Sequence, residues 1–272
     1  MSRLEKRFSE LRRDGRTALI PFVTAGDPEP SITVPLMHAL VSAGADVLEL
    51  GVPFSDPMAE GPAIQHACER ALVHDVSLHN VIDMVREFRQ QDGDTPVVLM
   101  GYLNPVEVMG CEAFASAAAD AGVDGVITVD LPPEEAGDYV AAFRKSGLDP
   151  IFLLAPTSTE ERVRKVADVA SGFIYYVSLR GVTGAAHIDT DEVKSRLDVI
   201  RKHTALPIGV GFGIKSPDIA ARVATVADAV VVGSALVSRI GELADQPDAI
   251  LKDVPAFLAS LREAVDTAEA AA

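Results

Sequence analysis

Eight short apolar runs recur along the 272-residue chain, and segments with helical periodicity separate them. Each run is four to six residues long and rich in β-branched residues, which is typical of buried parallel strands. The segments between them repeat apolar residues three or four positions apart, as at Ile32, Leu36 and Leu40. The eight candidate strands are residues 18–23, 47–50, 97–100, 125–129, 150–154, 173–177, 207–210 and 227–232.

Strand and helix alternate throughout, which predicts parallel βα units. An open doubly wound sheet is the alternative, but no G-x-G-x-x-G opens the first helix, where residues 24–28 read as a plain turn and helix start. No Pro/Ser-rich linker divides the eight units. We therefore expect residues 1–272 to form one domain, a (β/α)8 TIM barrel with extra N- and C-terminal helices at residues 2–13 and 247–271.

A glycine followed two residues later by an acid precedes several strands. Gly44, Gly122 and Gly147 each end a helical segment in this way. Glycine readily takes the left-handed conformation that stops a helix, so these positions predict helix ends.

Charge and composition exclude several classes of function. The chain has 40 acidic against 24 basic residues, a formal charge of −16. Phosphate-backbone binding needs a basic surface, and no Lys/Arg stripe occurs beyond residues 3–16, so nucleic acid is not expected as a partner. No apolar stretch approaches a membrane span, and the N-terminus does not resemble a signal peptide. With only two cysteines, the expected location is the cytoplasm.

Barrel enzymes carry their active residues at the carboxyl ends of the strands. Glu49 lies in the second candidate strand, and alternation places it with Val47 on the barrel interior if Leu48 and Leu50 face the helices. Burial raises the pKa of a carboxyl group toward the range of a general acid or base. The alternative for Glu49 is a salt-bridged core acid.

Three further segments follow strand ends. Residues 51–62 form a long Pro/Gly loop with Asp56 and Glu60, which is typical of a functional lid or, alternatively, of an irregular connection. Glycines after the seventh and eighth strands predict a phosphate site, with tight turns as the alternative. The sixth strand carries Tyr175, either a site residue or barrel filling, and leads into the glycine-bearing loop 178–187.

Two kinds of aldolase chemistry are not expected. All the lysines fall in predicted helices or helix starts, away from the barrel interior that a Schiff base needs. The six histidines share no strand end, so no metal site is expected. Carboxylate acid/base catalysis on a small phosphorylated substrate, without a cofactor, is the function class that remains.

Taken together, these motifs resemble those of the tryptophan synthase α subunit family over essentially the whole chain. The matching segments are residues 21–28, 49–65, 181–184, 211–213 and 233–234, of which Glu-Leu-Gly-Val-Pro-Phe-Ser-Asp-Pro is highly specific to the family. The resemblance implies a lyase that cleaves indole-3-glycerol phosphate into indole and glyceraldehyde 3-phosphate in tryptophan biosynthesis.

The resemblance also implies roles for individual residues. Glu49 would transfer protons at the glycerol hydroxyl and the ring carbon, Glu60 would engage the indole N–H, and Tyr175 would position the substrate. The family usually has aspartate where this chain has Glu60, which keeps the charge but reaches further. Substrate and phosphate contacts are expected from Phe22, Met100, Ile127, Thr183, Gly184, Gly211, Phe212, Gly213, Gly233 and Ser234.

Family resemblance further implies a partner, a β subunit that carries pyridoxal phosphate, in an α2β2 heterotetramer. Its expected contacts are Asp56, Pro57, Tyr102, Asn104, Asp130 and Pro132. Two alternatives stay open: a subunit that acts chiefly as an allosteric partner with negligible activity of its own, or another phosphate-handling barrel such as an isomerase or synthase. A related synthase would need a barrel lysine, which the sequence does not provide.

Overall fold

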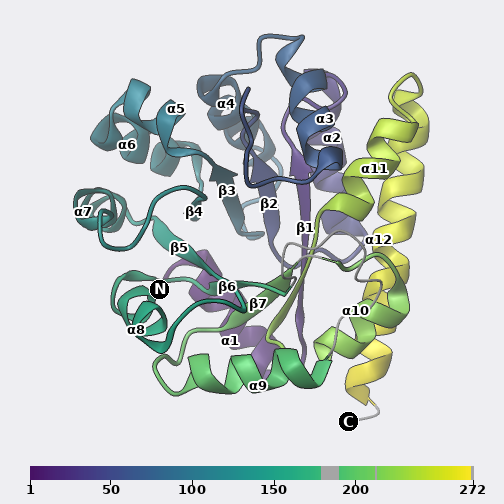
Figure 1. The fold of residues 1–272 in the computed structure, drawn as a ribbon. Helices are drawn as coiled ribbons and strands as arrows, with labels where there is room; N and C mark the ends of the chain where they lie inside the picture. The colour runs from purple at the N-terminus through teal and green to yellow at the C-terminus, as the bar shows by residue number, and fades with distance from the viewer. Residues whose placement is uncertain (179–189, 212, 271–272) are drawn as a thin grey trace.

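The computed structural model describes residues 1–178, 190–211 and 213–270 (Figure 1). Its eight strands pair in parallel in chain order and close into a barrel through β1 and β8. This closure rules out the doubly wound alternative, and every expected strand is confirmed to within two residues at either end. The strands are β1 Ala18–Thr24, β2 Leu48–Gly51, β3 Val97–Gly101, β4 Gly125–Thr128, β5 Asp149–Leu154, β6 Ile174–Val177, β7 Ile208–Gly211 and β8 Ala229–Val232.

Helices surround the barrel, and more than one follows several of the strands. Both expected terminal helices are present as α1 and α12. No helix within the described ranges is long and apolar enough to cross a membrane. The helices are α1 Arg3–Arg13, α2 Pro30–Ser42, α3 Pro62–Leu72, α4 Leu78–Phe88, α5 Leu103–Met109, α6 Cys111–Ala121, α7 Gly137–Lys145, α8 Glu160–Val169, α9 Thr190–Arg201, α10 Pro217–Ala224, α11 Ser234–Glu242 and α12 Pro247–Ala270.

Strand alternation separates two apolar cores. Leu48 and Leu50 belong to the outer core between the strands and the helices, whereas Val47 belongs to the barrel interior. Successive side chains of a strand point to opposite faces, so Glu49 shares the interior with Val47. The expected orientation of this strand is confirmed.

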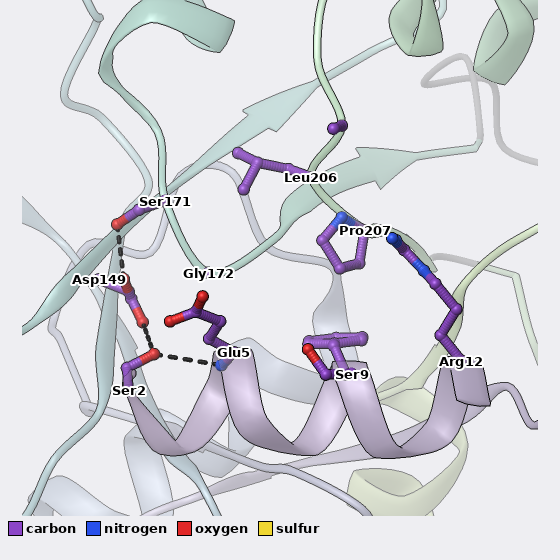
Figure 2. Close-up of a pocket in the computed structure, with 11 residues that line it drawn as sticks. Ser2, Glu5, Ser9, Arg12, Asp149, Ser171, Gly172, Leu206 and Pro207 are labelled. Atoms are coloured by element: carbon purple, nitrogen blue, oxygen red, sulfur yellow. Dashed lines mark hydrogen bonds between the residues drawn. The ribbon is translucent and has the colours of Figure 1, made fainter. Parts of the chain in front are cut away.

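Helix α1 closes the amino-terminal end of the barrel. Its Leu4, Phe8 and Leu11 are buried and join the interior core. Figure 2 shows α1 along one side of a pocket of about 420 Å³ at this end, with Asp149 bonded to Ser2 and Ser171. The pocket therefore lies at the end of the barrel opposite to the carboxyl ends of the strands.

The glycine-x-acid signature is structural. Gly44 and Gly122 have φ of 102° and 89°, a region that glycine adopts without strain, and each follows a helix. The acid two residues later accepts a backbone N–H of an earlier strand: Asp46 from Leu19 at 2.9 Å and Asp124 from Val97 at 2.8 Å. These acids fasten neighbouring strands at the amino-terminal end.

Helix α12 covers the seam where β8 meets β1. It packs against α10 and α2, and Figure 1 shows it in yellow at the edge of the barrel beside α10 and α11. Its Arg262 donates to the Thr17 carbonyl at 3.1 Å and to Asp46 Oδ2 at 3.0 Å. The expectation that the terminal helices cap and clasp the barrel is therefore confirmed.

Candidate active site

Interior side chains from five strands and the acid of the loop after β2 meet at the carboxyl end of the barrel. Phe22 of β1 pairs in register with Glu49 of β2, so the two lie at the same level. Met100 of β3, Ile127 of β4 and Tyr175 of β6 join Phe22 in the buried interior core. The structure thus brings together residues that are spread along the sequence from position 22 to position 175.

Glu49 is a buried acid for which the described residues provide no hydrogen-bond partner. Its residue is 1 % exposed, and neither carboxylate oxygen has a partner among the described residues. Burial, followed by the nearby Glu60 carboxylate, raises the pKa of Glu49 to about 8. No ion pair involving Glu49 occurs in the described part of the chain, which speaks against the salt-bridged core acid considered from the sequence.

Glu60 lies in the loop between β2 and α3 and faces the same interior. Its Oε2 is buried and has no partner among the described residues. Burial raises the pKa of Glu60 to about 7. The site therefore holds two neighbouring carboxyl groups whose pKa values lie near neutrality, the range that suits a general acid and a general base.

Tyr175 is buried in the same space. Burial, followed by the charges of Glu49 and Glu60, raises the pKa of Tyr175 well above its ordinary value, so its hydroxyl stays protonated. This hydroxyl packs against Gly211 at the end of β7, where a Cβ atom would overlap it. Tyr175 is therefore a protonated hydroxyl beside two carboxyl groups.

The loop that carries Glu60 rests on Tyr102. The Tyr102 hydroxyl accepts the Ala59 N–H at 2.9 Å, and its ring stacks on Phe54 at 5.1 Å. Tyr102 is only 5 % exposed, so its ring is not available on the surface in this structure. The other residues expected at a partner interface are more accessible: Asp56, Asn104 and Asp130 are exposed, and Pro57 and Pro132 are half-buried.

The glycine turns follow β7 and β8 as expected. Gly213 has φ of 80°, a conformation that favours glycine. Gly233 is the N-cap of α11, whose first turn, beginning at Ser234, receives no side-chain cap. The first N–H groups of a helix lack intrahelical partners and attract anions. Three expected contacts, Thr183, Gly184 and Phe212, lie outside the described residues.

Two features of the site were not anticipated from the sequence. Thr24, at the end of β1, has a buried hydroxyl without a partner among the described residues. It lines a small cavity of about 20 Å³ together with Phe22, Glu60 and Met100. The position of Thr24 at a strand end was the signal that could have identified it.

The second feature is Asp27, which the sequence suggested was part of a plain turn. Its residue is 1 % exposed, and it forms a bidentate ion pair with Arg70 of α3 at 2.6 and 2.9 Å. This pair ties the turn after β1 to the helix that follows Glu60. Neither a group of residues suited to hold a metal ion nor a buried lysine occurs among the residues that the structure describes.

A closed eight-stranded parallel barrel with facing buried carboxyl groups at the carboxyl ends of its strands defines the class of (β/α)8-barrel enzymes. Comparison with known proteins narrows the class. The family model described as tryptophan synthase alpha chain matches residues 8–266. The chain belongs to this family, and it is a lyase of tryptophan biosynthesis.

Individual relatives are similar to this chain over nearly their full length. The tryptophan synthase alpha chain of Thioalkalivibrio sulfidiphilus is 66 % identical over 98 % of this chain and 100 % of its own. That of Methylococcus capsulatus is 60 % identical with the same coverage. The crystal structure of tryptophan synthase subunit alpha from Legionella pneumophila superposes with a TM-score of 0.91 at 47 % identity, covering 98 % of this chain and 99 % of the other.

Proposed function

We propose that this chain cleaves indole-3-glycerol phosphate into indole and glyceraldehyde 3-phosphate by a retro-aldol reaction, with Glu49 and Glu60 as its acid and base. The observation that carries the proposal is a pair of neighbouring carboxyl groups whose pKa values are raised to about 8 and about 7. Both oxygens of Glu49 and Oε2 of Glu60 are buried and have no hydrogen-bond partner among the described residues. Buried polar atoms without partners are rare in proteins, and a ligand with O–H and N–H donors would satisfy them.

The chemistry divides between the two acids. Glu49, the group with the higher pKa, is the one that holds a proton near neutral pH and delivers it to the indole ring carbon. Its carboxylate then accepts the proton of the glycerol hydroxyl as the carbon–carbon bond breaks and the aldehyde forms. Glu60 accepts the indole N–H, which stabilises the ring while it is protonated, and Tyr175 donates its hydroxyl to position the substrate.

Substrate contacts follow from the same arrangement. Phe22, Met100 and Ile127 supply an apolar surface for the indole ring. The phosphate binds at the uncapped start of α11, at Gly233 and Ser234, and at the turn of Gly211 and Gly213. Thr183, Gly184 and Phe212 complete this set by resemblance to the family.

A β subunit that carries pyridoxal phosphate is the proposed partner, in an α2β2 assembly; this chain binds no cofactor of its own in the proposal. Support comes from the carboxyl end of the barrel, where Asp56, Asn104 and Asp130 are exposed. Met58 and Val108, in the segments after β2 and β3, are each 82 % exposed and offer apolar contacts there. We further propose that the chain is a single domain located in the cytoplasm.

Incubation of the purified chain with indole-3-glycerol phosphate, with and without a β subunit, tests the proposal. We expect indole and glyceraldehyde 3-phosphate in equal amounts, and faster release with the β subunit present. A chain that forms no indole under either condition would be an allosteric partner without lyase activity. Conversion of the substrate to an isomer or a closed-ring product would assign another phosphate-handling reaction.

A further inference from the structure

The carboxylate of Glu60 has little of its own to hold it in place. Its buried Oε2 accepts no hydrogen bond from any described residue. It also belongs to a loop in which Asp56, Met58 and Ala59 are exposed. The direction of this side chain must therefore be set by the backbone to which it is attached.

That backbone is held at three consecutive points. The Ala59 N–H donates to the Tyr102 hydroxyl at 2.9 Å, and the Glu60 N–H donates to the Pro57 carbonyl at 3.0 Å. On the other side, the Gln65 side-chain amide donates to the Glu60 carbonyl at 2.8 Å. Two of these bonds come from side chains outside the loop: Gln65 binds the peptide group that follows the Glu60 α-carbon, and Tyr102 binds the peptide group that precedes the Ala59 α-carbon.

Both of these side chains come from well-anchored parts of the fold. Tyr102 is the N-cap of α5 directly after β3, and its buried ring stacks on Phe54 with an interplanar angle of 22°. Gln65 lies near the start of α3, between Ile64 and the buried Ala67 and Cys68 of that helix. A residue at a barrel strand end and a residue on a helix therefore hold the loop that carries Glu60.

We propose that Gln65 and Tyr102 are positioning residues for the reaction, which hold the backbone at the Glu60 carbonyl and at the Ala59 N–H and so aim the Glu60 carboxylate into the barrel. The inference rests on the proposed function, because it assigns the two residues to the geometry of the same acid. In this proposal neither residue contacts the reacting atoms.

The residue types suit this task. The Gln65 amide is a neutral donor, so it holds the Glu60 carbonyl without adding a charge beside the carboxylate. A lysine there would stabilise the ionised carboxylate and lower its pKa, while a glutamate would repel both the carbonyl and the acid. Tyr102 supplies an acceptor to a backbone N–H and a ring that packs on Phe54.

Two single variants test the positioning role. Gln65→Met keeps the length of the side chain without its donor, and Tyr102→Phe keeps the ring without its acceptor. Because a misplacement of about 1 Å can cost ~10²-fold in rate, and one hydrogen bond contributes roughly 1 kcal/mol, we expect kcat to fall about 5- to 10-fold in each. KM should change by less than about 2-fold, since neither residue binds the substrate.

His66→Met is the matched control, because His66 is the exposed neighbour of Gln65 on α3 and pairs with Glu69 on the same helix. All variants are assayed with indole-3-glycerol phosphate in the complex with the β subunit, after urea unfolding shows that each is folded. If Gln65→Met is unstable, Gln65→Leu, which also lacks the donor and carries no charge, replaces it. Parental kcat in both variants overturns the proposal, as does an equal loss in His66→Met.

A second measurement separates positioning from general stability. If Gln65 and Tyr102 act through Glu60, their substitution in a Glu60→Gln background should leave the residual kcat unchanged, because no carboxylate remains to be aimed. A further 5- to 10-fold loss in that background would show that they act elsewhere and would overturn the proposal. Absence of indole formation by the parent chain would instead count against the proposed function.

Discussion

The hydroxyl of Tyr175 occupies the space that a side chain at Gly211 would need. A Cβ atom there would also lie 2.6 Å from Cζ and 2.8 Å from Cε1 of the same ring. Contacts this short do not occur between real side chains, so the Tyr175 ring can lie here only because residue 211 is a glycine. The orientation of a proposed site residue on β6 thus depends on the absence of a side chain on β7.

Gly211→Ala should therefore displace Tyr175 and cost about 1–3 kcal/mol of stability through overpacking, with a loss of kcat/KM. Gly209→Ala is the matched control on the same strand, because its Cβ would meet Phe173 and Val231 at an ordinary 3.4 Å. Urea unfolding and steady-state kinetics measure both effects. Equal stability of the two variants would contradict the packing argument.

Gly233→Ala tests the phosphate site. Its Cβ would point toward Phe22 at 3.6 Å, an acceptable contact that nevertheless fills space at the barrel mouth. If the start of α11 binds the phosphate, the added methyl group should push the phosphate away from one of the helix N–H groups, and the loss of that charge-assisted hydrogen bond should raise KM by roughly 10-fold or more. Gly137→Ala, at the open start of α7, should leave KM unchanged. An unaltered KM in a folded Gly233→Ala would remove α11 from the site.

The two carboxyl groups predict the pH dependence of activity. They interact, so they titrate as a pair with apparent pKa values near about 7 and about 8. The reaction needs one group protonated and the other ionised, a form that is most abundant between those two values. We expect a bell-shaped profile of kcat/KM with its maximum there. In Glu60→Gln the limb of lower pH should disappear from whatever activity remains.

The raised pKa of Glu49 also predicts how the free energy of unfolding depends on pH. Its pKa is raised from 4.5 to about 8 in the folded chain, so between these values the folded state binds more protons than the unfolded state. The free energy of unfolding therefore falls as the pH rises through this window. Glu49→Gln removes the ionisable group and should reduce this slope over the same window of pH, between 4.5 and about 8, as measured by urea unfolding. The exposed Glu107→Gln should keep the parental slope.

Glu60→Asp and Glu60→Gln together test whether Glu60 does the work of the aspartate that the family usually has at this position. Asp shortens the reach by about 1.5 Å, which a loop held at Ala59 and Glu60 can follow only in part, so we expect a modest loss of kcat. Gln removes the ionisable group and should cost roughly 10²- to 10⁴-fold. Indole production in the presence of the β subunit is the readout. Near-parental activity of Glu60→Gln would transfer the role to another acid, with Asp56 the first to test.

The sequence predicted the barrel well because its signals are local. Alternation places Glu49 inward from two neighbouring leucines, and helix-stopping glycines such as Gly44 and Gly122 need no knowledge of distant residues. The supports of the site were not predictable in this way. The ion pair of Asp27 with Arg70 and the hydrogen bond of Tyr102 with Ala59 each join residues 43 positions apart in the sequence. Such contacts form only when the barrel has closed.

The bond from Arg262 to Asp46 spans 216 positions and has a consequence for the order in which this chain folds. A ribosome makes α12 after all eight strands, so the seam between β1 and β8 lacks its cover until synthesis has passed residue 247. The buried Asp46 lacks Arg262 until synthesis has passed residue 262, and the apolar outer face of the seam is open to other chains until α12 is made. We therefore expect chaperones that bind apolar surface to bind nascent or truncated chains.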